Sequence, residues 1–463
     1  MEIIERKRKR DDVMAASSAS SPSHGYEIVT IKTWLGGWSS SGVDNNNSTT
    51  TNNNDNNNST NEANDILPLV DLRSYDEFNK THLHTDDATP LIVNLPLATL
   101  ISGERSCELP PRHVEFAILV PSNNTELFLS RNSQCSIHNL FFASKSSATQ
   151  QSRKPWLVRQ VILESEQLWN EEGVLNYIKR NTDVSCESKG GAISFRPLPR
   201  LWKPDPLVSS GILPLLKYWI IKQCNNTSSR TESNHQYTPC TVFDLGSGAG
   251  RDVCYLAEET KAFYHNTILR HQAQEQNKSR QCNHFPLHFV GVDNHKGSAK
   301  RCEPLWKNRG IDDITTSHLL NLNKLDLVND CFTNTTFIDE ATTDEKSKSA
   351  VVCIYAIRFL NRKLLSHIAS STSSIKSIDL EPSSLCLPIG TIIAISHFCK
   401  PTKTAHWNFD HPKVSNVLER DELSTLFGNK GSDGEKWSIL KDDICSDGDH
   451  GRTLIQFIAR KIA

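Results

Sequence analysis

Short apolar runs alternate with longer amphipathic segments over residues 207–463. Compact apolar runs of about four to eight residues predict buried strands, whereas apolar positions spaced three and four apart predict helices. The expected strands are Thr241–Leu245, Leu287–Val292, His318–Leu322, Ala350–Tyr355, Thr391–His397, Trp437–Leu440 and Thr453–Ala459. The expected helices are Leu207–Ile221, Arg251–Glu259, Ser298–Asn308, Asn361–Ala369 and Asn416–Phe427. This alternation indicates an α/β domain with a doubly wound, mainly parallel, seven-stranded sheet.

A second, compact α/β domain is predicted ahead of this one, over residues 66–175. The apolar run Ile66–Val70 precedes a helix-like segment for which Ser74 is a suitable N-cap. Further apolar runs are found at Leu91–Leu95, Val114–Val120 and Trp156–Ile162. A proline-rich connection, residues 176–206, then leads into the larger domain.

Residues 1–64 are predicted to form a disordered tail. Asn45–Asn58 consists almost wholly of Asn, Ser and Thr, and such a stretch has too little apolar surface to offset its ordering entropy. The basic cluster Arg6–Arg10 within this tail is either a nuclear localisation signal or merely solvated charge.

Length and composition narrow the class of protein. The chain has 463 residues, about three times a typical domain, so two or three domains are expected. It has neither a membrane-length apolar run nor a signal-peptide pattern at its N-terminus. Its 13 cysteines are scattered without metal-ligand spacing, which predicts reduced thiols, no metal site and a cytoplasmic location, with the nucleus as the alternative. A net charge of -2 argues against an extensive nucleic-acid surface.

The most informative segment runs from Asp244 to Arg251, Asp-Leu-Gly-Ser-Gly-Ala-Gly-Arg. A strand leads into alternating glycines and then a helix, so backbone can approach a ligand closely at the strand's carboxyl end. The dinucleotide fingerprint would need its third glycine where Arg251 stands, which counts against a nicotinamide oxidoreductase. Asp244 is a poor neighbour for pyrophosphate but a good acceptor for an ammonium group. The pattern therefore favours a cationic cofactor that carries an amino acid.

An acid also ends the next predicted strand. Asp293 can accept hydrogen bonds from both hydroxyls of a ribose, although its distance from the glycines exceeds the usual spacing of about 20 residues. The polar insertion His265–His284 accounts for the excess. The alternative is that Asp293 is an ordinary helix cap.

Residues 196–463 resemble the class I S-adenosylmethionine-dependent methyltransferases, especially the tellurite-resistance type, through Asp244-Leu245-Gly246-Ser247-Gly248-Ala249-Gly250-Arg251-Asp252. The resemblance implies S-adenosyl-L-methionine as the cofactor, with Asp244 near its amino group. It also implies that the cofactor lies over a floor made of Gly246, Gly248 and Gly250. Asp326 lies in a segment that resembles the family's adenine-contacting loop, and a solvent-exposed carboxylate is the alternative reading.

The same resemblance implies that the carboxyl end of the fourth predicted strand, Ala350–Tyr355, faces the transferable methyl group, as it does in this family. Tyr355, Arg358 and Phe359 are therefore the expected substrate-facing residues, with a core position as the alternative for Phe359. His397 or His406 would be available as a general base, or either is structural. No Asn-Pro-Pro-Tyr signature supports methylation of a nucleobase amine.

Residues 66–175 resemble a rhodanese-like domain through Asp71-Leu72-Arg73, Glu77-Phe78 and Asn94-Leu95-Pro96. Active members of that family carry a nucleophilic Cys in the loop after the next strand. Here that loop is Pro121–Asn124 and has no Cys. The expected role of the domain is therefore non-catalytic.

These features together predict a methyltransferase that moves the methyl of S-adenosyl-L-methionine to an unidentified acceptor. A small molecule, a protein and RNA all remain open as acceptors. The alternative is a non-catalytic interaction protein that retains both folds.

Overall fold

The structure is a computed structural model and describes fifteen segments of the chain. They are residues 26–39, 67–83, 91–130, 135–142, 155–165, 167–170, 178–180, 197–228, 240–269, 285–334, 350–372, 385–428, 430–431, 434–446 and 452–463. The chain divides into unit 1, Met1–Glu187 with Pro199–Trp202, and unit 2, Ser188–Leu198 with Lys203–Ala463. Among the described residues, no helix has the length and apolar character needed to cross a membrane.

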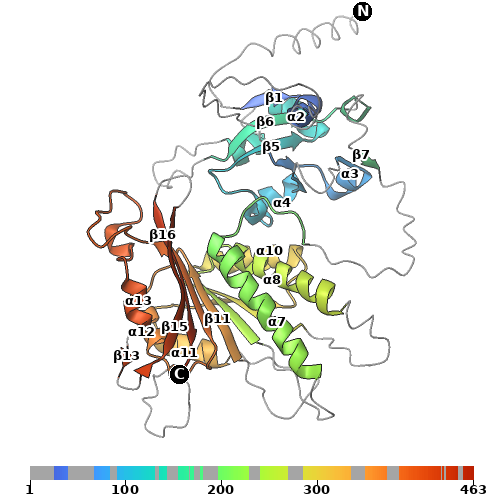
Figure 1. Cartoon of the computed structure of the whole chain (residues 1–463). Coiled ribbons are helices and arrows are strands. Elements are labelled where there is room, and N and C mark those ends of the chain that lie inside the picture. The colour runs from blue at the N-terminus through green and yellow to red at the C-terminus, as the bar shows by residue number, and fades with distance from the viewer. Residues whose placement is uncertain are drawn as a thin grey trace, which may run out of the picture. The chain divides into compact units, whose positions relative to one another are not determined.

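A seven-stranded sheet forms the centre of unit 2, in the order β10-β9-β8-β11-β12-β16-β15 (Figure 1). Its strands are β8 (Cys240–Leu245), β9 (Leu287–Asp293), β10 (Thr315–Leu319), β11 (Ala350–Ile357), β12 (Ile392–Phe398), β15 (Trp437–Ser446) and β16 (Thr453–Lys461). The first five strands run parallel to one another, and β16 runs antiparallel to both β12 and β15. The predicted α/β domain with a mainly parallel sheet is confirmed.

Helices cover both faces of this sheet (Figure 1). On one face lie α7 (Leu213–Ser228), α8 (Arg251–Phe263) and α10 (Lys296–Asn308); on the other lie α11 (Leu325–Asn334), α12 (Arg362–Ala369) and α13 (Glu422–Phe427). Phe243 and Leu245 of β8 join the core under the second group. Because side chains alternate along a strand, Val242 and Asp244 point to the face that α8 covers. The glycine loop therefore emerges where a buried acid and the start of a helix meet.

The order of the strands locates a switch point between β8 and β11. The chain continues from β8 to β9 on one side, whereas β11 flanks β8 on the other side. In open parallel sheets, ligands bind outside the carboxyl ends of the strands at such a point. The segments that follow β8, β9 and β11 are therefore the ones to search for a site.

Several predicted boundaries differ from the structure; β15, for example, ends at Ser446 and not at Leu440. β10 spans Thr315–Leu319, three residues earlier than expected, because Thr315 and Thr316 pair with β9. The helix expected from Asn416 begins only at Glu422, since Leu418 forms a bridge to Cys399 and holds the preceding segment extended. The segment that contains Asp326 is the first turn of α11 and not a loop, which corrects that expectation.

Unit 1 contains a parallel five-stranded sheet in the order β1-β6-β5-β2-β4. These strands are β1 (Glu27–Val29), β2 (Leu69–Asp71), β4 (Ile92–Asn94), β5 (Glu115–Val120) and β6 (Leu157–Leu163). β3 (Thr81–Leu83) pairs separately with β7 (Ile178–Arg180). The helices of the unit are α2 (Ile31–Ser39), α3 (Tyr75–Lys80), α4 (Leu97–Ile101), α5 (Ser122–Leu129) and α6 (Ser136–Phe141). The expected cap at Ser74 is confirmed, since Ser74 and Glu77 form a reciprocal capping box.

Residues 1–64, predicted to be a mostly disordered tail, contain an ordered segment, β1 and α2. β1 pairs with β6 in parallel and so belongs to the sheet of unit 1. Trp34 of α2 is buried, and its indole N–H donates to the Leu67 carbonyl over 3.2 Å. The sequence analysis missed β1 and α2 because the asparagine-rich stretch Asn45–Asn58 dominates the composition of the N-terminal region. That stretch and the basic cluster Arg6–Arg10 lie outside the described residues.

The burial of Trp34 predicts that β1 and α2 stabilise unit 1. Trp34→Ala in the full chain should cost about 3–5 kcal/mol, because it removes a large core side chain and leaves a cavity. The matched control is Lys32→Ala on the same helix, where the side chain is exposed and the expected cost is under about 0.5 kcal/mol. Hydrogen exchange of the β5 and β6 amides measures the effect. Equal protection in the two variants would show that the N-terminal segment is not part of this core.

Candidate active site

The glycine loop between β8 and α8 requires glycine at three positions. Gly246, Gly248 and Gly250 have φ angles of +80°, +57° and +69°, in the left-handed region that other residues avoid. The Gly246 amide donates to the carbonyl of Val292 at the end of β9 over 2.8 Å. The loop therefore turns tightly across the ends of two neighbouring strands before α8 begins.

The three glycines have different surroundings. A Cβ on Gly246 would lie 2.7 Å from the ring of Phe359, and one on Gly250 would lie 2.8 Å from Cys302 Sγ and 2.9 Å from Trp306. The Trp306 indole N–H also donates to the Gly250 carbonyl over 3.1 Å. A Cβ on Gly248 would meet nothing nearer than the Gly246 carbonyl oxygen at 3.9 Å. Packing within the protein thus accounts for Gly246 and Gly250, whereas the space beside Gly248 is open.

Asp293 joins the end of β9 to this loop. One carboxylate oxygen accepts a hydrogen bond from the Gly248 amide at 2.9 Å, and the other accepts one from the His295 amide at 2.8 Å. The N-cap of α10 is His295, whose Nδ1 accepts from the Gly297 amide, so Asp293 is not the helix cap. The structure therefore brings two of the predicted cofactor residues, Gly248 and Asp293, into direct contact.

Asp244 is a buried acid without a basic partner. Burial raises the pKa of its carboxyl well above the ordinary value, the negative charge of Asp252 adds to the effect, and the Tyr355 hydroxyl opposes it. Tyr355 is the register partner of Asp244 on β11 and is itself fully buried. Among the described residues, no Lys or Arg forms an ion pair with Asp244. A carboxyl in this setting gains most from a cationic ligand.

Two further acids, which the sequence analysis did not select, lie beside Asp244. Asp252 in the first turn of α8 accepts a hydrogen bond from the Asp205 amide at 3.3 Å. Burial, with the nearby charge of Asp205, raises the pKa of Asp252 to about 6. The Asp205 carboxylate in turn accepts from Ser396 Oγ at 3.1 Å. The sequence did offer a signal for Asp252, which directly follows Arg251 in the glycine motif. It offered none for Asp205, which is 39 residues before Asp244 and meets Asp252 only in the folded chain.

The expected substrate-facing residues follow β11 and take different positions. Tyr355 is buried beside Asp244, whereas Arg358 is exposed and has a φ of +55°. The Arg358 amide donates to the Ser396 carbonyl over 2.6 Å, which holds this unusual backbone turn against β12. Phe359 packs on Gly246 and against the core, which agrees with the reading of Phe359 as a core residue.

The remaining sequence candidates differ in their surroundings. Asp326 is exposed in the first turn of α11. His397 is buried, its Nε2 lies 2.8 Å from the Asn416 carbonyl, and burial lowers its pKa, which favours a structural role. His406 lies exposed in the segment after β12. No group of three His, Cys, Asp or Glu side chains suited to a metal ion occurs in the described part of the chain.

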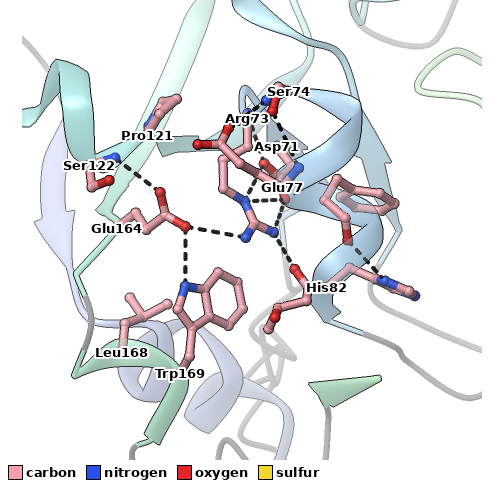
Figure 2. Close-up of polar contacts among 12 residues, drawn as sticks. Asp71, Arg73, Ser74, Glu77, His82, Pro121, Ser122, Glu164, Leu168 and Trp169 are labelled. Carbon is pink, nitrogen blue, oxygen red and sulfur yellow. Dashed lines mark hydrogen bonds and ion pairs between the residues drawn. The ribbon is translucent and has the colours of Figure 1, made fainter. Parts of the chain in front are cut away.

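Unit 1 holds a separate polar network around Arg73 (Figure 2). The buried guanidinium pairs with Asp71 at 2.7 Å and with Glu164 at 3.2 Å, and it lies 4.3 Å from the centre of the Trp169 ring. The other oxygen of Glu164 accepts from the Ser122 amide at 3.0 Å. The predicted loop Pro121–Asn124 is the start of α5, and a carboxylate of the protein itself occupies its first amide.

Solved structures with similarity to the chain include methyltransferases. TehB from Haemophilus influenzae is 13% identical over 52% of this chain and 62% of its own length, with a TM-score of 0.27. The methyltransferase domain of bacterial CtHen1-C is 12% identical over 55% of this chain and 100% of its own, with a TM-score of 0.30. Geranyl diphosphate C-methyltransferase from Streptomyces coelicolor A3(2) is 12% identical over 54% of this chain and 79% of its own length, with a TM-score of 0.26. No protein-family model and no curated protein matches the chain.

The raised pKa of Asp252 predicts a pH-dependent cost to stability. In the unfolded chain this carboxyl titrates near 3.8, and in the folded protein near 6, so its penalty grows from about pH 4 to 6 and is complete above pH 6. Asp252→Asn removes this penalty and should therefore raise the melting temperature of unit 2 at pH 7.5 by a few degrees, since 1 kcal/mol corresponds to about 2–4 °C in a domain of this size. The increase should be smaller at pH 4.5, where the penalty is only partly present.

Differential scanning calorimetry at the two pH values measures this difference. Asp312→Asn, at an exposed acid in the same unit, is the matched control and should change neither value by more than about a degree. A lower melting temperature of Asp252→Asn at pH 7.5 would contradict the penalty.

Proposed function

We propose that unit 2 is a methyltransferase that binds S-adenosyl-L-methionine at the carboxyl ends of β8 and β9. The proposal rests on two features of the site: the open approach at Gly248, and the buried acid Asp244, which has no basic partner among the described residues. A ligand that combines an ammonium, a sulfonium and a ribose satisfies both features. Its cationic part offsets the cost of the buried carboxylates, and its neighbouring atoms require the close backbone approach that Gly248 permits.

Each residue then has a defined task. Asp244 accepts hydrogen bonds from the ammonium group, and the Gly248 backbone lies under the ligand. Asp293 turns from the Gly248 amide toward the ribose hydroxyls, which its position at the end of β9 permits. Asp326 as the acceptor for the adenine amine stays a proposal that rests on the sequence resemblance alone.

The bound sulfonium supplies a methyl carbon that is already activated for displacement, so the protein's contribution is to bind, orient and exclude water. Phe359 covers the loop at Gly246 and so shields one side of the site from solvent. Tyr355 holds its hydroxyl near Asp244 and sets the electrostatics of that carboxyl. Arg358 directly follows the end of β11 and is exposed.

For unit 1 we propose a rhodanese-like domain that does not transfer sulfur. Glu164 supports this proposal, because its carboxylate accepts from the Ser122 amide at the place where an active member would stabilise a thiolate. Cys107 and Cys135 are both buried, and a buried thiol is a poor nucleophile. Unit 1 then acts as a folding or binding partner.

The cofactor assignment predicts the outcome of a titration with S-adenosylhomocysteine. Asp244→Asn should weaken binding by at least about tenfold, since a hydrogen bond to a charged group is worth about 1.5–3 kcal/mol. Gly248→Ala should weaken it by a similar factor, because the new methyl group enters the open space where the ligand must approach. Isothermal titration calorimetry on the full chain measures both variants.

Gly310→Ala is the matched control for backbone strain. Gly310 has a φ of +63° with nothing within 4 Å of its absent Cβ, and it follows α10 at the other end of the sheet. Both alanine variants should lose about 1–2 kcal/mol of stability, and only Gly248→Ala should lose affinity. Unchanged affinity in Asp244→Asn and Gly248→Ala would remove the cofactor assignment. Binding without methyl transfer to any fraction of a cell extract would favour a non-catalytic interaction protein.

The proposal for unit 1 predicts no thiosulfate-to-cyanide sulfur transfer by the full chain. No thiolate can form at the start of α5, where Pro121 and Ser122 replace the nucleophile. A colorimetric thiocyanate assay, with an active rhodanese as the positive control, tests this expectation. Measurable activity that disappears in Cys135→Ser would overturn it.

A further inference from the structure

Helix α10 holds the glycine loop through two side chains that lie four residues apart. The Cys302 thiol donates to the Gly248 carbonyl over 3.5 Å, and the Trp306 indole N–H donates to the Gly250 carbonyl over 3.1 Å. Residues four apart share one face of a helix, so both side chains point from α10 toward the loop. Both are almost fully buried. The helix therefore binds the backbone of two of the three loop glycines.

The Trp306 ring also packs closely on both the loop and β9. A Cβ on Gly250 would lie 2.9 Å from the Cζ2 atom of this ring, and a Cβ on Gly291 would lie 3.1 Å from its Cη2 atom. Gly291 is the register partner of Asp244 on the neighbouring strand. The ring thus contacts the glycine loop and the part of β9 beside Asp244, and its position sets how the loop lies on the strand ends.

Both polar backbone groups of Gly248 are bound from the same stretch of chain. Its amide donates to Asp293 at the end of β9, and its carbonyl accepts from Cys302 in the helix that follows. In the proposed function, Asp293 turns to the ribose and releases the amide. The bonds from Cys302 and Trp306 to the loop carbonyls do not involve Asp293, so they hold the loop while that change takes place.

The Gly250 carbonyl accepts a second hydrogen bond, from the Cys254 amide over 2.9 Å, which belongs to the first turn of α8. A carbonyl oxygen has two lone pairs, so it can accept from both donors. Loss of the Trp306 indole N–H would therefore leave this carbonyl with a partner. The start of α8 should survive such a change, whereas the loop loses one of its two hydrogen bonds to α10.

We infer that Trp306 and Cys302 are positioning residues for S-adenosyl-L-methionine, which act through the backbone of the glycine loop and hold it in the shape that the ligand requires. This inference rests on the proposed function and adds two residues to its site. A loop that is ordered before the ligand arrives loses less conformational entropy on binding, which raises the affinity. Supporting side chains maintain the geometry of a binding site in this way.

The test measures binding of S-adenosylhomocysteine to the full chain by isothermal titration calorimetry. Trp306→Phe removes the indole N–H and should weaken binding about fivefold or more, as the loss of one hydrogen bond predicts. Trp437→Phe is the matched control, since Trp437 is equally buried in unit 2 and its indole N–H also donates to a backbone carbonyl, that of Ala369, over 3.0 Å. Both variants should lower the melting temperature, and Trp437→Phe should keep the wild-type affinity within about twofold.

A second pair of variants tests the bond to Gly248. Cys302→Ala removes the donor and should weaken binding about threefold, whereas Cys302→Ser keeps a donor and should restore most of the affinity. Hydrogen exchange of the loop amides, residues 246–250, gives a readout that does not depend on the ligand. Exchange in the ligand-free chain should be faster in Trp306→Phe and Cys302→Ala than in wild type, and unchanged in Trp437→Phe.

Equal affinities of Trp306→Phe and Trp437→Phe for S-adenosylhomocysteine would overturn the inference, because the loss would then follow stability alone. Should Trp306→Phe fail to fold, the cysteine variants decide, and wild-type affinity in Cys302→Ala would overturn the inference. All of these outcomes leave binding by the wild-type chain intact. Failure of the wild-type chain to bind S-adenosylhomocysteine would instead remove the proposed function, and this inference with it.

Discussion

The left-handed backbone of Gly246, Gly248 and Gly250 is the constraint on which the candidate site depends. Three positive φ angles within five residues let the chain leave β8, cross the end of β9 and enter α8 in a tight turn. The turn aims the Gly248 amide at Asp293 and leaves the space beside Gly248 open. Phe359 on one side and Trp306 on the other fix the loop, so the opening does not depend on a flexible segment.

The acids around this loop are costly for the protein on its own. Burial raises the pKa of both Asp244 and Asp252, and their charges repel each other. Natural proteins keep such unfavourable groups mainly where function requires them, because substitution elsewhere would stabilise the fold. The cost of burying the Asp244 carboxyl is therefore better explained by the cationic ligand that we propose than by stability.

The sequence predicted the fold of unit 2 well because its strands are short apolar runs with clear limits. It also singled out Asp244, the glycines and Asp293, which are close together in the chain or follow apolar strands, and the structure brings Gly248 and Asp293 into contact. Asp205 and the hydrogen bond of Trp306 to Gly250 depend on contacts across many residues and were not predictable. β1 and α2 were missed because a long polar stretch dominates the composition around them. Asp326 was expected in a loop because its segment resembles the adenine-contacting loop of the family, whereas it lies in the first turn of α11.

The two polar centres of the chain illustrate how a structural charge differs from one that awaits a ligand. In unit 1, the buried Arg73 has a partner at each guanidinium nitrogen, in Asp71, Glu164 and the Thr81 carbonyl. Glu164 is likewise shared between Arg73, Trp169 and the Ser122 amide. In unit 2, Asp244 is equally buried and has no basic partner in the described part of the chain. A saturated network holds elements together, whereas an unsaturated acid beside open backbone provides a place to bind a cation.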